Sequence, residues 1–374
     1  MFTSPPAYGH LYPMMPLAMA CAEAGHDVTV ATGAPFLDRL PLPTVPSLPD
    51  GMRFRDLQAR TRADHPDHDT STLEGLLQFG GFMFGQTMAR AVTPMLLDAF
   101  GRIKPDLVVY ECNDVGAPVA ADLLGIRAMA YGVGAATEVF QRWHRIAVQD
   151  QRDRWQGREP GDLASYPGGY LDPVPDALYG DWPMPPNRIP VRTTSWSQPA
   201  PLPAMLAGAA SRPRVYVTLG TVVYGAVDVL RRAVLETAAH DVDVVVAVGP
   251  EGDPAALGEL PGNVHLERYV PQDLVLRKVD LVVHHGGVGT VLGTLARGLP
   301  QLLLPQGADQ PMMAELVTRC GAGRALTNDE QAPGAIGAAV GALLGDGPER
   351  AMAARFAGEI AALPAPADVV DLLG

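Results

Sequence analysis

A short apolar run, a turn and a helical stretch follow one another repeatedly along this chain, and that order constrains the fold more than any other feature. Strands that alternate with helices in this way form parallel sheets whose faces the helices cover. The pattern occurs in both halves of the sequence. In the first half we expect strands at Asp27–Thr32, Asp106–Tyr110 and Arg127–Tyr131, with helices at Met14–Ala24 and Ala117–Leu124. In the second half we expect strands at Arg214–Leu219, Val242–Val248, Asn263–Leu266, Leu281–His284 and Gln301–Leu304.

The length suits two such domains, because 374 residues exceed what one hydrophobic core usually serves. The stretch from about Asp181 to Arg214 is crowded with proline and has no strand or helix period until its last turns, which predicts an interdomain connection. We therefore expect a first domain over residues 1–185, a linker over 186–212 and a second domain over 213–360. Only Met1–Thr3 precede the first loop, so either the first strand is very short or residues that normally precede it are missing.

Charge and cysteine content exclude several classes of protein. A net charge of −13 argues against a nucleic-acid partner, because phosphate backbones need clustered Lys and Arg. The three cysteines, Cys21, Cys112 and Cys320, are far apart and lack CxxC spacing, so we expect no disulfide framework, no metal site and a cytoplasmic location. The apolar N-terminal segment has no basic start and is interrupted by prolines, so we reject a signal peptide, and no apolar stretch is long enough for a membrane span.

The strongest functional signal is LVVHHGGVGT, Leu281–Thr290, where a buried strand meets a glycine turn and then a helix. Such a turn directs backbone N–H groups and the positive end of a helix dipole at one spot, which suits a diphosphate. The alternative is a glycine turn that serves packing alone. We expect His284 to be a hydrogen-bonded core residue and His285 to touch a phosphate oxygen. The predicted diphosphate-binding residues of the turn are His285, Gly286, Gly287, Val288, Gly289 and Thr290.

Three further loops are expected near this turn. Asp309 and Gln310 follow the next strand, and carboxylate and amide groups together suit a hydroxyl-rich ligand such as a sugar. Gly220 and Thr221 end the first strand of the second domain and could donate to phosphate from the other side. Tyr269 and Val270 precede a turn, where the ring could stack near a nucleobase while the Val270 backbone pairs with its edge. A surface Tyr and a solvated Asp-Gln turn are the alternative interpretations.

In the first domain, His10 and Glu111 are the candidate catalytic residues. His10 lies in the loop after the first strand, and Glu111 follows the strand DLVVY, so both reach the same edge of the predicted sheet. An imidazole is the usual general base near neutral pH, and a carboxylate on its far nitrogen fixes the tautomer and raises the basicity. The alternative for His10 is a structural helix cap.

Apolar and aromatic loops of the first domain predict a greasy small-molecule partner. The polar segment Arg60–Thr72 precedes the apolar, Gly-rich stretch Leu73–Phe84, a combination that fits either a lid or a surface helix packed on the core. A second apolar and aromatic segment is found around Gly134–Trp143. The residues that we expect to line an acceptor pocket are Phe79, Phe82, Phe84, Phe140 and Trp143.

The motifs GHLYP, AGHDVTVAT, PDLVVYE, VTLGT, ERYVPQ, HHGGVGT, GLPQLLLPQGADQ and LPAPADVVDLL extend over nearly the whole chain. Together they resemble the GT-B glycosyltransferases of secondary metabolism, which attach deoxysugars to macrolides, enediynes and aromatic polyketides and include the calicheamicin glycosyltransferases. The resemblance implies two Rossmann-like α/β domains that face each other across a cleft, with a C-terminal helix, residues 361–374, that crosses back to the first domain.

The same resemblance implies an inverting transfer from a TDP- or UDP-sugar to a hydrophobic aglycone without a metal or other cofactor. By it, His285 and Gly287–Thr290 would bind the diphosphate, Asp309 and Gln310 the sugar, and Tyr269–Val270 the base. Two departures matter. Some relatives place the basic histidine where this chain has Tyr8, and plant relatives have a ribose-binding acid where this chain has Gly293, which suits a deoxyribose donor.

Two other functions fit the motifs. A catalytically silent protein could bind a nucleotide-sugar or assist a partner enzyme with the second domain alone, and a GT-B sugar-nucleotide epimerase would act on the donor without an acceptor. The sequence names neither the aglycone nor the deoxysugar, nor the atom that is glycosylated. It also leaves a homodimer open.

Overall fold

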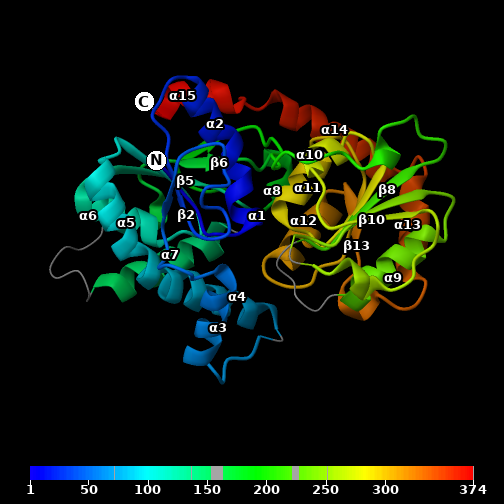
Figure 1. Ribbon diagram of the computed structural model, residues 1–374, viewed down its shortest axis with the longest axis horizontal. Helices are drawn as coiled ribbons and strands as arrows, with labels where there is room; N and C mark the ends of the chain where they lie inside the picture. Colours follow the sequence, from blue (N-terminus) through cyan, green and yellow to red (C-terminus); the bar gives the residue numbers. More distant parts are fainter. Residues whose placement is uncertain (71, 136, 153–162, 221–226, 251, 374) are drawn as a thin grey trace. The chain divides into compact units, whose positions relative to one another are not determined.

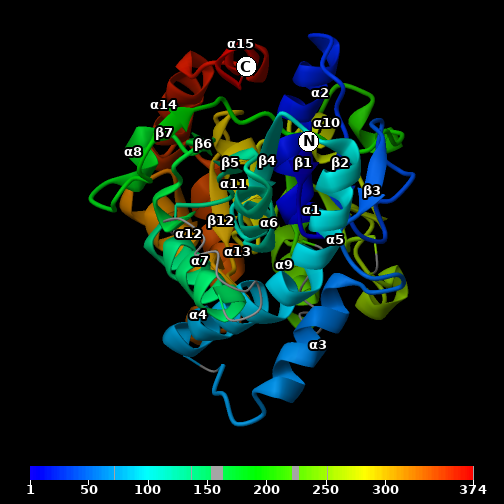
Figure 2. The same ribbon diagram turned by 90° about the vertical axis from the view of Figure 1, so that its left-hand side faces the viewer.

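The computed structural model describes residues 1–70, 72–135, 137–152, 163–220, 227–250 and 252–373, which form two compact units. Unit 1 contains Met1–Val174, Asp181–Arg192 and Pro364–Gly374, and unit 2 contains Pro175–Gly180 and Thr193–Leu363. Each unit is built on a parallel β-sheet that helices flank (Figures 1 and 2). The expected fold class of two Rossmann-like α/β domains is thus confirmed.

The sheet of unit 1 has the strand order β3-β2-β1-β4-β5-β6-β7, and every neighbouring pair is parallel. The chain runs outward from β1 to β3 and then returns to place β4 on the other side of β1. Loops at the carboxyl ends of such a pair diverge, and ligands of open α/β sheets bind there. The strands are β1 (Phe2–Thr3), β2 (Val30–Thr32), β3 (Thr44–Pro46), β4 (Leu107–Glu111), β5 (Arg127–Tyr131), β6 (Tyr170–Asp172) and β7 (Arg188–Pro190).

The helices of unit 1 include an irregular region. A π-helix, Met83–Met88, joins α4 to α5 without a break, and α7 packs against it. The C-terminal helix α15 packs on α2, and Arg127 Nη1 donates to the Leu373 carbonyl over 3.0 Å. The helices are α1 (Tyr8–Leu11), α2 (Met15–Glu23), α3 (Phe54–Asp64), α4 (Leu73–Phe82), α5 (Ala89–Ile103), α6 (Gly116–Leu124), α7 (Thr137–Arg152) and α15 (Pro366–Leu373).

The sheet of unit 2 repeats this topology with the order β10-β9-β8-β11-β12-β13, again parallel throughout. Its order reverses between β8 and β11, so the loops after these two strands diverge as the loops after β1 and β4 do in unit 1. The strands are β8 (Arg214–Thr218), β9 (Asp243–Ala247), β10 (Val264–Glu267), β11 (Leu281–His284), β12 (Gln301–Leu303) and β13 (Gly323–Ala325). The helices are α8 (Asp176–Tyr179), α9 (Val227–Ala238), α10 (Gln272–Val275), α11 (Val288–Leu295), α12 (Gln310–Arg319), α13 (Ala335–Leu344) and α14 (Pro348–Ala362).

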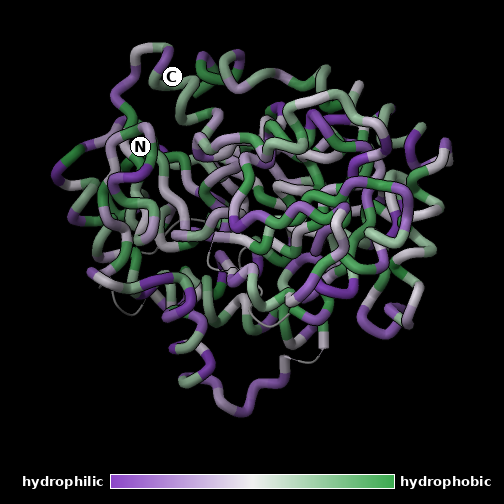
Figure 3. The backbone as a smooth tube through the Cα atoms, turned by 45° about the vertical axis from the view of Figure 1, so that its right-hand side comes forward, coloured by the Kyte–Doolittle hydropathy of each residue, from purple (hydrophilic) through white to green (hydrophobic). Residues whose placement is uncertain are grey.

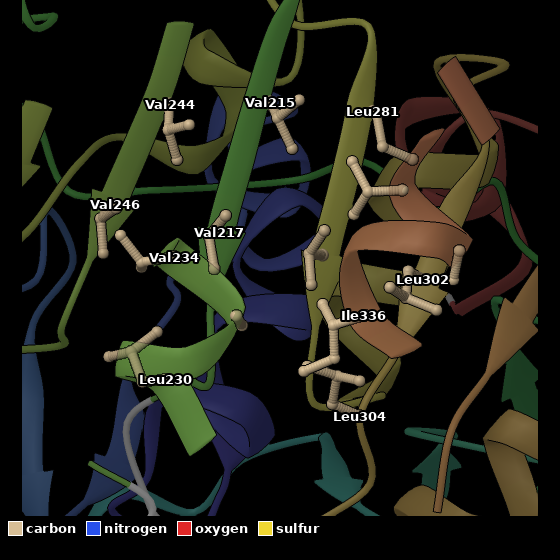
Figure 4. Packing of buried hydrophobic residues seen from close by; sticks show 14 of the residues in the cluster. Val215, Val217, Leu230, Val234, Val244, Val246, Leu281, Leu302, Leu304 and Ile336 are labelled. Carbon is tan, nitrogen blue, oxygen red and sulfur yellow. The ribbon is translucent and has the colours of Figure 1, made fainter. Parts of the chain in front are cut away.

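Both faces of the unit 2 sheet are buried, which explains why its strands read as continuous apolar runs. Alternate residues such as Val215, Val217, Val244 and Val246 pack against α9 and α13 (Figure 4). Residues between them form a second cluster on the opposite face, with the side chains that follow β10. That cluster contains Leu206, Tyr216, Val245, Ala247, Val270, Val275, Leu276, Val279 and Val282.

The structure differs from the sequence-based expectation in several elements, and β3, β6 and β13 were not expected. β2 begins at Val30 rather than Asp27, and β7 lies within the stretch where we expected neither strand nor helix. The polar segment Arg60–Thr72 starts inside α3, which ends at Asp64, and the hydrophilic chain after α3 forms the lowest part of Figure 3. In the described residues, no helix is long and apolar enough to cross a membrane. All three cysteines are free.

Candidate active site

The turn after β11 has the geometry that its glycines predict. Gly286 adopts φ +94°, a left-handed conformation that favours glycine. Gly287 then caps α11 with φ −60° and ψ 134°, extended backbone that any residue adopts. The first-turn amides of Val288 and Gly289 have no intrahelical acceptor, since the fourth preceding carbonyl lies outside the helix. They are donors for an anion at the positive end of the dipole.

His284 is a core residue, as expected. It is fully buried, its Nε2 donates to Gln301 Oε1 over 2.8 Å, and its Nδ1 accepts from the Gly286 amide over 3.1 Å. Burial lowers the pKa of His284 to about 3, with His285 acting in the same direction. The imidazole is therefore neutral, and the Gly286 amide that we expected to bind phosphate is already held by His284. Gly286 shapes the turn in this structure, and its phosphate contact stays a prediction.

Buried neutral histidines make stability depend on pH. Burial lowers the pKa of His144 to about 4 and that of His284 to about 3, whereas both are near 6.5 when unfolded. Protonation therefore favours the unfolded chain. The stability that each neutral histidine contributes is fully present above pH 6.5 and is lost as the pH falls. Between pH 7 and 5 we expect the free energy of unfolding to drop by about 2 kcal/mol per residue. Denaturant titrations should show a flatter dependence for His144→Gln, while His26→Gln, at an exposed site, should match the unmodified protein.

The His285 ring lies between two glycine turns. A Cβ built on Gly220 would lie 2.5 Å from His285 Cε1, and one on Gly287 would lie 2.5 Å from its Nε2. No real Cβ approaches so closely, so glycine is required at both positions while the ring stays there. His285 Nδ1 is buried and has no hydrogen-bond partner among the described residues, and burial lowers the pKa of His285 to about 4. A neutral imidazole clamped beside a helix N-terminus has one N–H to offer an anion.

The loop after β12 lies beside this turn. A Cβ on Gly286 would lie 3.3 Å from the Gln310 carbonyl oxygen, which agrees with the expected proximity. Gln310 begins α12 and its side-chain Oε1 accepts from the Gln306 and Gly307 amides, over 2.8 and 3.2 Å. The Gln310 side-chain oxygen therefore holds the loop in place. The side-chain nitrogen of Gln310 is the group that remains for a ligand. Asp309 is half-buried at the N-cap of α12.

The remaining donor candidates surround α10 and α11. The Tyr269 hydroxyl donates to the Gln198 carbonyl over 3.3 Å, and the Val270 side chain is buried in the core. The Thr290 hydroxyl donates to Gln272 Oε1 over 3.3 Å, and a Cβ on Gly293 would lie 2.5 Å from the Ser195 hydroxyl. Ser195 and Gln272 were not predicted as site residues, since nothing in a Pro-rich stretch or a short turn marks them. Thr221 lies outside the described residues.

In unit 1 the structure brings His10 and Glu111 together. His10 lies on the short helix α1 that follows β1, rather than in a loop, and Glu111 is the last residue of β4. β1 and β4 are neighbours, with Thr3 opposite Tyr110, and His10 Nδ1 lies 3.1 Å from Glu111 Oε2. Glu111 is fully buried, and its other oxygen accepts from the Asn113 amide over 3.1 Å. The His10 side chain is 20% exposed. A carboxylate fixed at both oxygens holds Nδ1–H, so Nε2 is the nitrogen that would accept a proton.

Aromatic rings surround His10. Phe84, on the π-helix, and Phe54, the first residue of α3, have ring centres 5.6 and 5.7 Å from that of His10. Extra-wide helical turns are rare and occur mostly at functional sites, and this one presents Phe84 to the imidazole. Phe54 was missed because it follows a Pro-rich segment with no aromatic pattern.

The other predicted acceptor residues lie in two different environments. Phe140 and Trp143 are 2% and 7% exposed, and the Trp143 indole donates to the Leu77 carbonyl over 3.1 Å. Both side chains are therefore buried among the helices of unit 1. Phe82 and Phe79 are half-buried: His65 stacks on Phe82 with ring centres 3.9 Å apart, and Arg62 covers Phe79. Contact of these five residues with an acceptor stays a prediction.

No group of three or more His, Cys, Asp or Glu side chains in the described part of the chain could hold a metal ion.

Comparison with known proteins assigns both halves of the chain to one protein family. Residues 19–220 match the family model "Erythromycin biosynthesis protein CIII-like, N-terminal domain", and residues 231–374 match the corresponding C-terminal domain.

Similar proteins are sugar transferases. An L-demethylnoviosyl transferase of Streptomyces niveus is 32% identical over 99% of this chain and 96% of its own length. The glycosyltransferase SsfS6 of Streptomyces sp. SF2575, solved in complex with thymidine diphosphate, has a TM-score of 0.83 at 25% identity, covering 99% of this chain and 98% of that one. The spinosyn rhamnosyltransferase SpnG, solved in complex with spinosyn aglycone, has a TM-score of 0.80 at 26% identity, covering 100% and 99%.

Proposed function

Since this chain belongs to the erythromycin biosynthesis protein CIII-like family and is a nucleotide-sugar-dependent glycosyltransferase of antibiotic biosynthesis, we propose that it moves a deoxysugar to a hydrophobic aglycone with inversion. TDP- and UDP-sugars are the candidate donors. The observation that carries the donor assignment is the turn after β11, where His285 is clamped between Gly220 and Gly287 beside two first-turn amides.

Unit 2 supplies the donor site in this proposal. The Val288 and Gly289 amides and the His285 N–H donate to the diphosphate, and the helix dipole adds about 0.3–1 kcal/mol, or up to about 2 where water is excluded. Charge grows on the diphosphate as the anomeric C–O bond breaks, so donors fixed in advance stabilise the transition state more than the ground state. The Gln310 amide nitrogen and Asp309 are the groups proposed for the sugar hydroxyls.

Unit 1 supplies the base. His10 Nε2 takes the proton of the acceptor hydroxyl, the acceptor oxygen forms a bond to the anomeric carbon, and the diphosphate leaves with the electron pair of the broken C–O bond. Attack opposite to the leaving group inverts the configuration in one displacement. Glu111, held by the Asn113 amide, keeps Nδ1 protonated and stabilises the imidazolium that forms.

The surroundings of Gly293 favour a deoxyribose donor. A Cβ at this position would lie 2.5 Å from the Ser195 hydroxyl and 3.1 Å from Leu276 Cδ1, and glycine offers no acid there. A ribose 2′-hydroxyl would therefore lack the carboxylate partner that plant relatives use. We propose that TDP-sugars are preferred over UDP-sugars.

The function is tested by supplying TDP- and UDP-deoxysugars with pools of polycyclic and macrolide aglycones and following glycosylated products by mass spectrometry. We expect an aglycone-dependent product and TDP release, with TDP raising the melting temperature because it binds only the folded state. TDP binding without any transfer would favour the silent binding protein, and a changed sugar without aglycone would favour the epimerase. The similar proteins support neither alternative. Activity in EDTA would support the proposed metal independence.

Location and assembly complete the proposal. Three free cysteines fit a reducing cytoplasm, which is where we place the enzyme. Sedimentation velocity would measure the oligomeric state and show whether the enzyme forms a homodimer.

A further inference from the structure

Two phenylalanine rings and the His10 imidazole form one aromatic group in unit 1. The ring centres of Phe54 and Phe84 are 6.0 Å apart, and their planes meet at 45°. The imidazole is tilted by 39° to the Phe54 ring and by 50° to the Phe84 ring. All three pairs lie at separations where aromatic rings attract one another, about 4.5–7 Å between centres. We call this group, Phe54, Phe84 and His10, the aromatic slot.

Buried contacts hold the two phenylalanine rings in place. The hydroxyls of Thr61 on α3 and Thr87 on the π-helix hydrogen-bond over 3.0 Å, and both side chains are buried. Trp143 of α7 stacks on Phe84, with ring centres 5.1 Å apart and an interplanar angle of 21°. A Cβ on Gly80 would collide with the Trp143 indole, so α7 approaches closer than a side chain there would allow. The spacing of the two rings is thus fixed before any ligand arrives.

The accessible part of the aromatic slot lies at the base. Phe84 is only 6% exposed, whereas Phe54 is half-buried and the His10 side chain is 20% exposed. His10 Nδ1 faces the buried Glu111, so the accessible side of the imidazole is the one that carries Nε2. Because the His10 and Phe54 ring centres are 5.7 Å apart, a molecule that reaches Nε2 also meets the Phe54 ring.

The chemistry of the aromatic slot favours one class of acceptor. Each aromatic neighbour gives a flat aromatic ring about 2- to 12-fold in affinity beyond the effect of burial, whereas a puckered aliphatic ring gains from burial alone. The base favours the same class. A phenolic hydroxyl has a pKa of about 10, against about 16 for water, so a neutral imidazole removes a phenolic proton far more readily than one from a hydroxyl as weakly acidic as water.

We propose that Phe54 and Phe84 are specificity-determining residues, which hold a flat aromatic ring of the acceptor beside His10, and that the glycosylated hydroxyl is phenolic. The inference rests on the proposed function and narrows its hydrophobic aglycone to this class. The phenolic proton goes to His10 Nε2, and the phenolic oxygen forms a bond to the anomeric carbon. The diphosphate leaves with the electron pair of the broken C–O bond.

Binding of a matched pair of small acceptors tests the aromatic slot without any sugar transfer. 2-Naphthol is flat and aromatic, and decahydro-2-naphthol has the same carbon skeleton but is puckered and more hydrophobic. We expect 2-naphthol to bind the ligand-free enzyme at least about fivefold more tightly, since two aromatic neighbours each contribute about twofold or more. Hydrophobicity alone predicts the opposite order. NMR titrations that follow the His10 ring give both Kd values and report where the compounds bind.

Leucine variants assign this preference to the two rings. Phe54→Leu and Phe84→Leu keep an apolar side chain and remove the ring, so each should reduce the preference for 2-naphthol by about twofold or more. Leu124→Ala, at the exposed end of α6, is the control and should leave both Kd values unchanged. Phe54 is half-buried, so its variant tests the proposal even if Phe84→Leu fails to fold.

Three outcomes would overturn the proposal. They are equal Kd values for the two compounds, a preference for 2-naphthol that both leucine variants retain, and an active enzyme that glycosylates only aliphatic hydroxyls in the aglycone pools. The NMR titrations need neither donor nor turnover. A preference for 2-naphthol that the leucine variants lose would therefore support the aromatic slot even where no sugar is transferred, and a failure of the transferase proposal is seen separately.

Discussion

His10→Ala is expected to lower kcat for sugar transfer by about 10²-fold or more, within the range that a general base contributes. The loss arises because Glu111 positions the imidazole through Nδ1, and alanine leaves no group to accept the hydroxyl proton. The Kd for TDP should change less than about twofold, because the proposed diphosphate ligands belong to unit 2 and His10 to unit 1. Single-turnover product formation and calorimetric titration with TDP measure the two quantities.

Glu111→Gln is the companion to this variant. It keeps the shape of the side chain but removes the charge that stabilises the imidazolium, so its loss of kcat should be smaller than that of His10→Ala. Because Glu111 acts through His10, the double variant should be no slower than His10→Ala alone. A His10→Ala enzyme with unchanged turnover would remove His10 from its proposed role.

The two sheets could be predicted from the sequence because their strands are bounded by strong signals. β11 matches the expected range, since its apolar run lies between a charged Asp280 and two glycines. β2 is shorter than expected because its partners are short: β1 begins at Phe2, opposite Val30, and β3 begins at Thr44. β7 escaped prediction because a proline-containing edge strand needs few ladder hydrogen bonds, so it carries little β signal.

Side-chain roles inside the site were harder to predict, because they depend on which hydrogen bonds the loops themselves require. The sequence placed His10 beside Glu111 correctly, since parallel neighbouring strands bring their carboxyl-end loops together. It could not show that Gln310 holds its own loop, because that contact depends on the unusual backbone at Gly307 and Ala308.

Gly287→Ala is expected to weaken TDP binding by about tenfold or more. The backbone at Gly287 is one that alanine adopts without strain, so any loss comes from the side chain. The added methyl group would lie 2.5 Å from His285 Nε2 and force the ring to move. The lost contact is a hydrogen bond to a charged phosphate, worth about 1.5–3 kcal/mol, which corresponds to roughly 10- to 150-fold in Kd.

A double-mutant cycle separates this steric mechanism from general damage to the turn. His285→Ala alone should weaken TDP binding by a similar factor, since it removes the same donor. Once the ring is absent, the methyl group at residue 287 has nothing to displace, so the double variant should bind TDP as His285→Ala does. Losses that instead multiply would mean that Gly287 contributes independently of the imidazole, and His285 would then not be the group through which this glycine controls diphosphate binding. Melting temperatures of all three variants, measured without ligand, show whether the turn still folds.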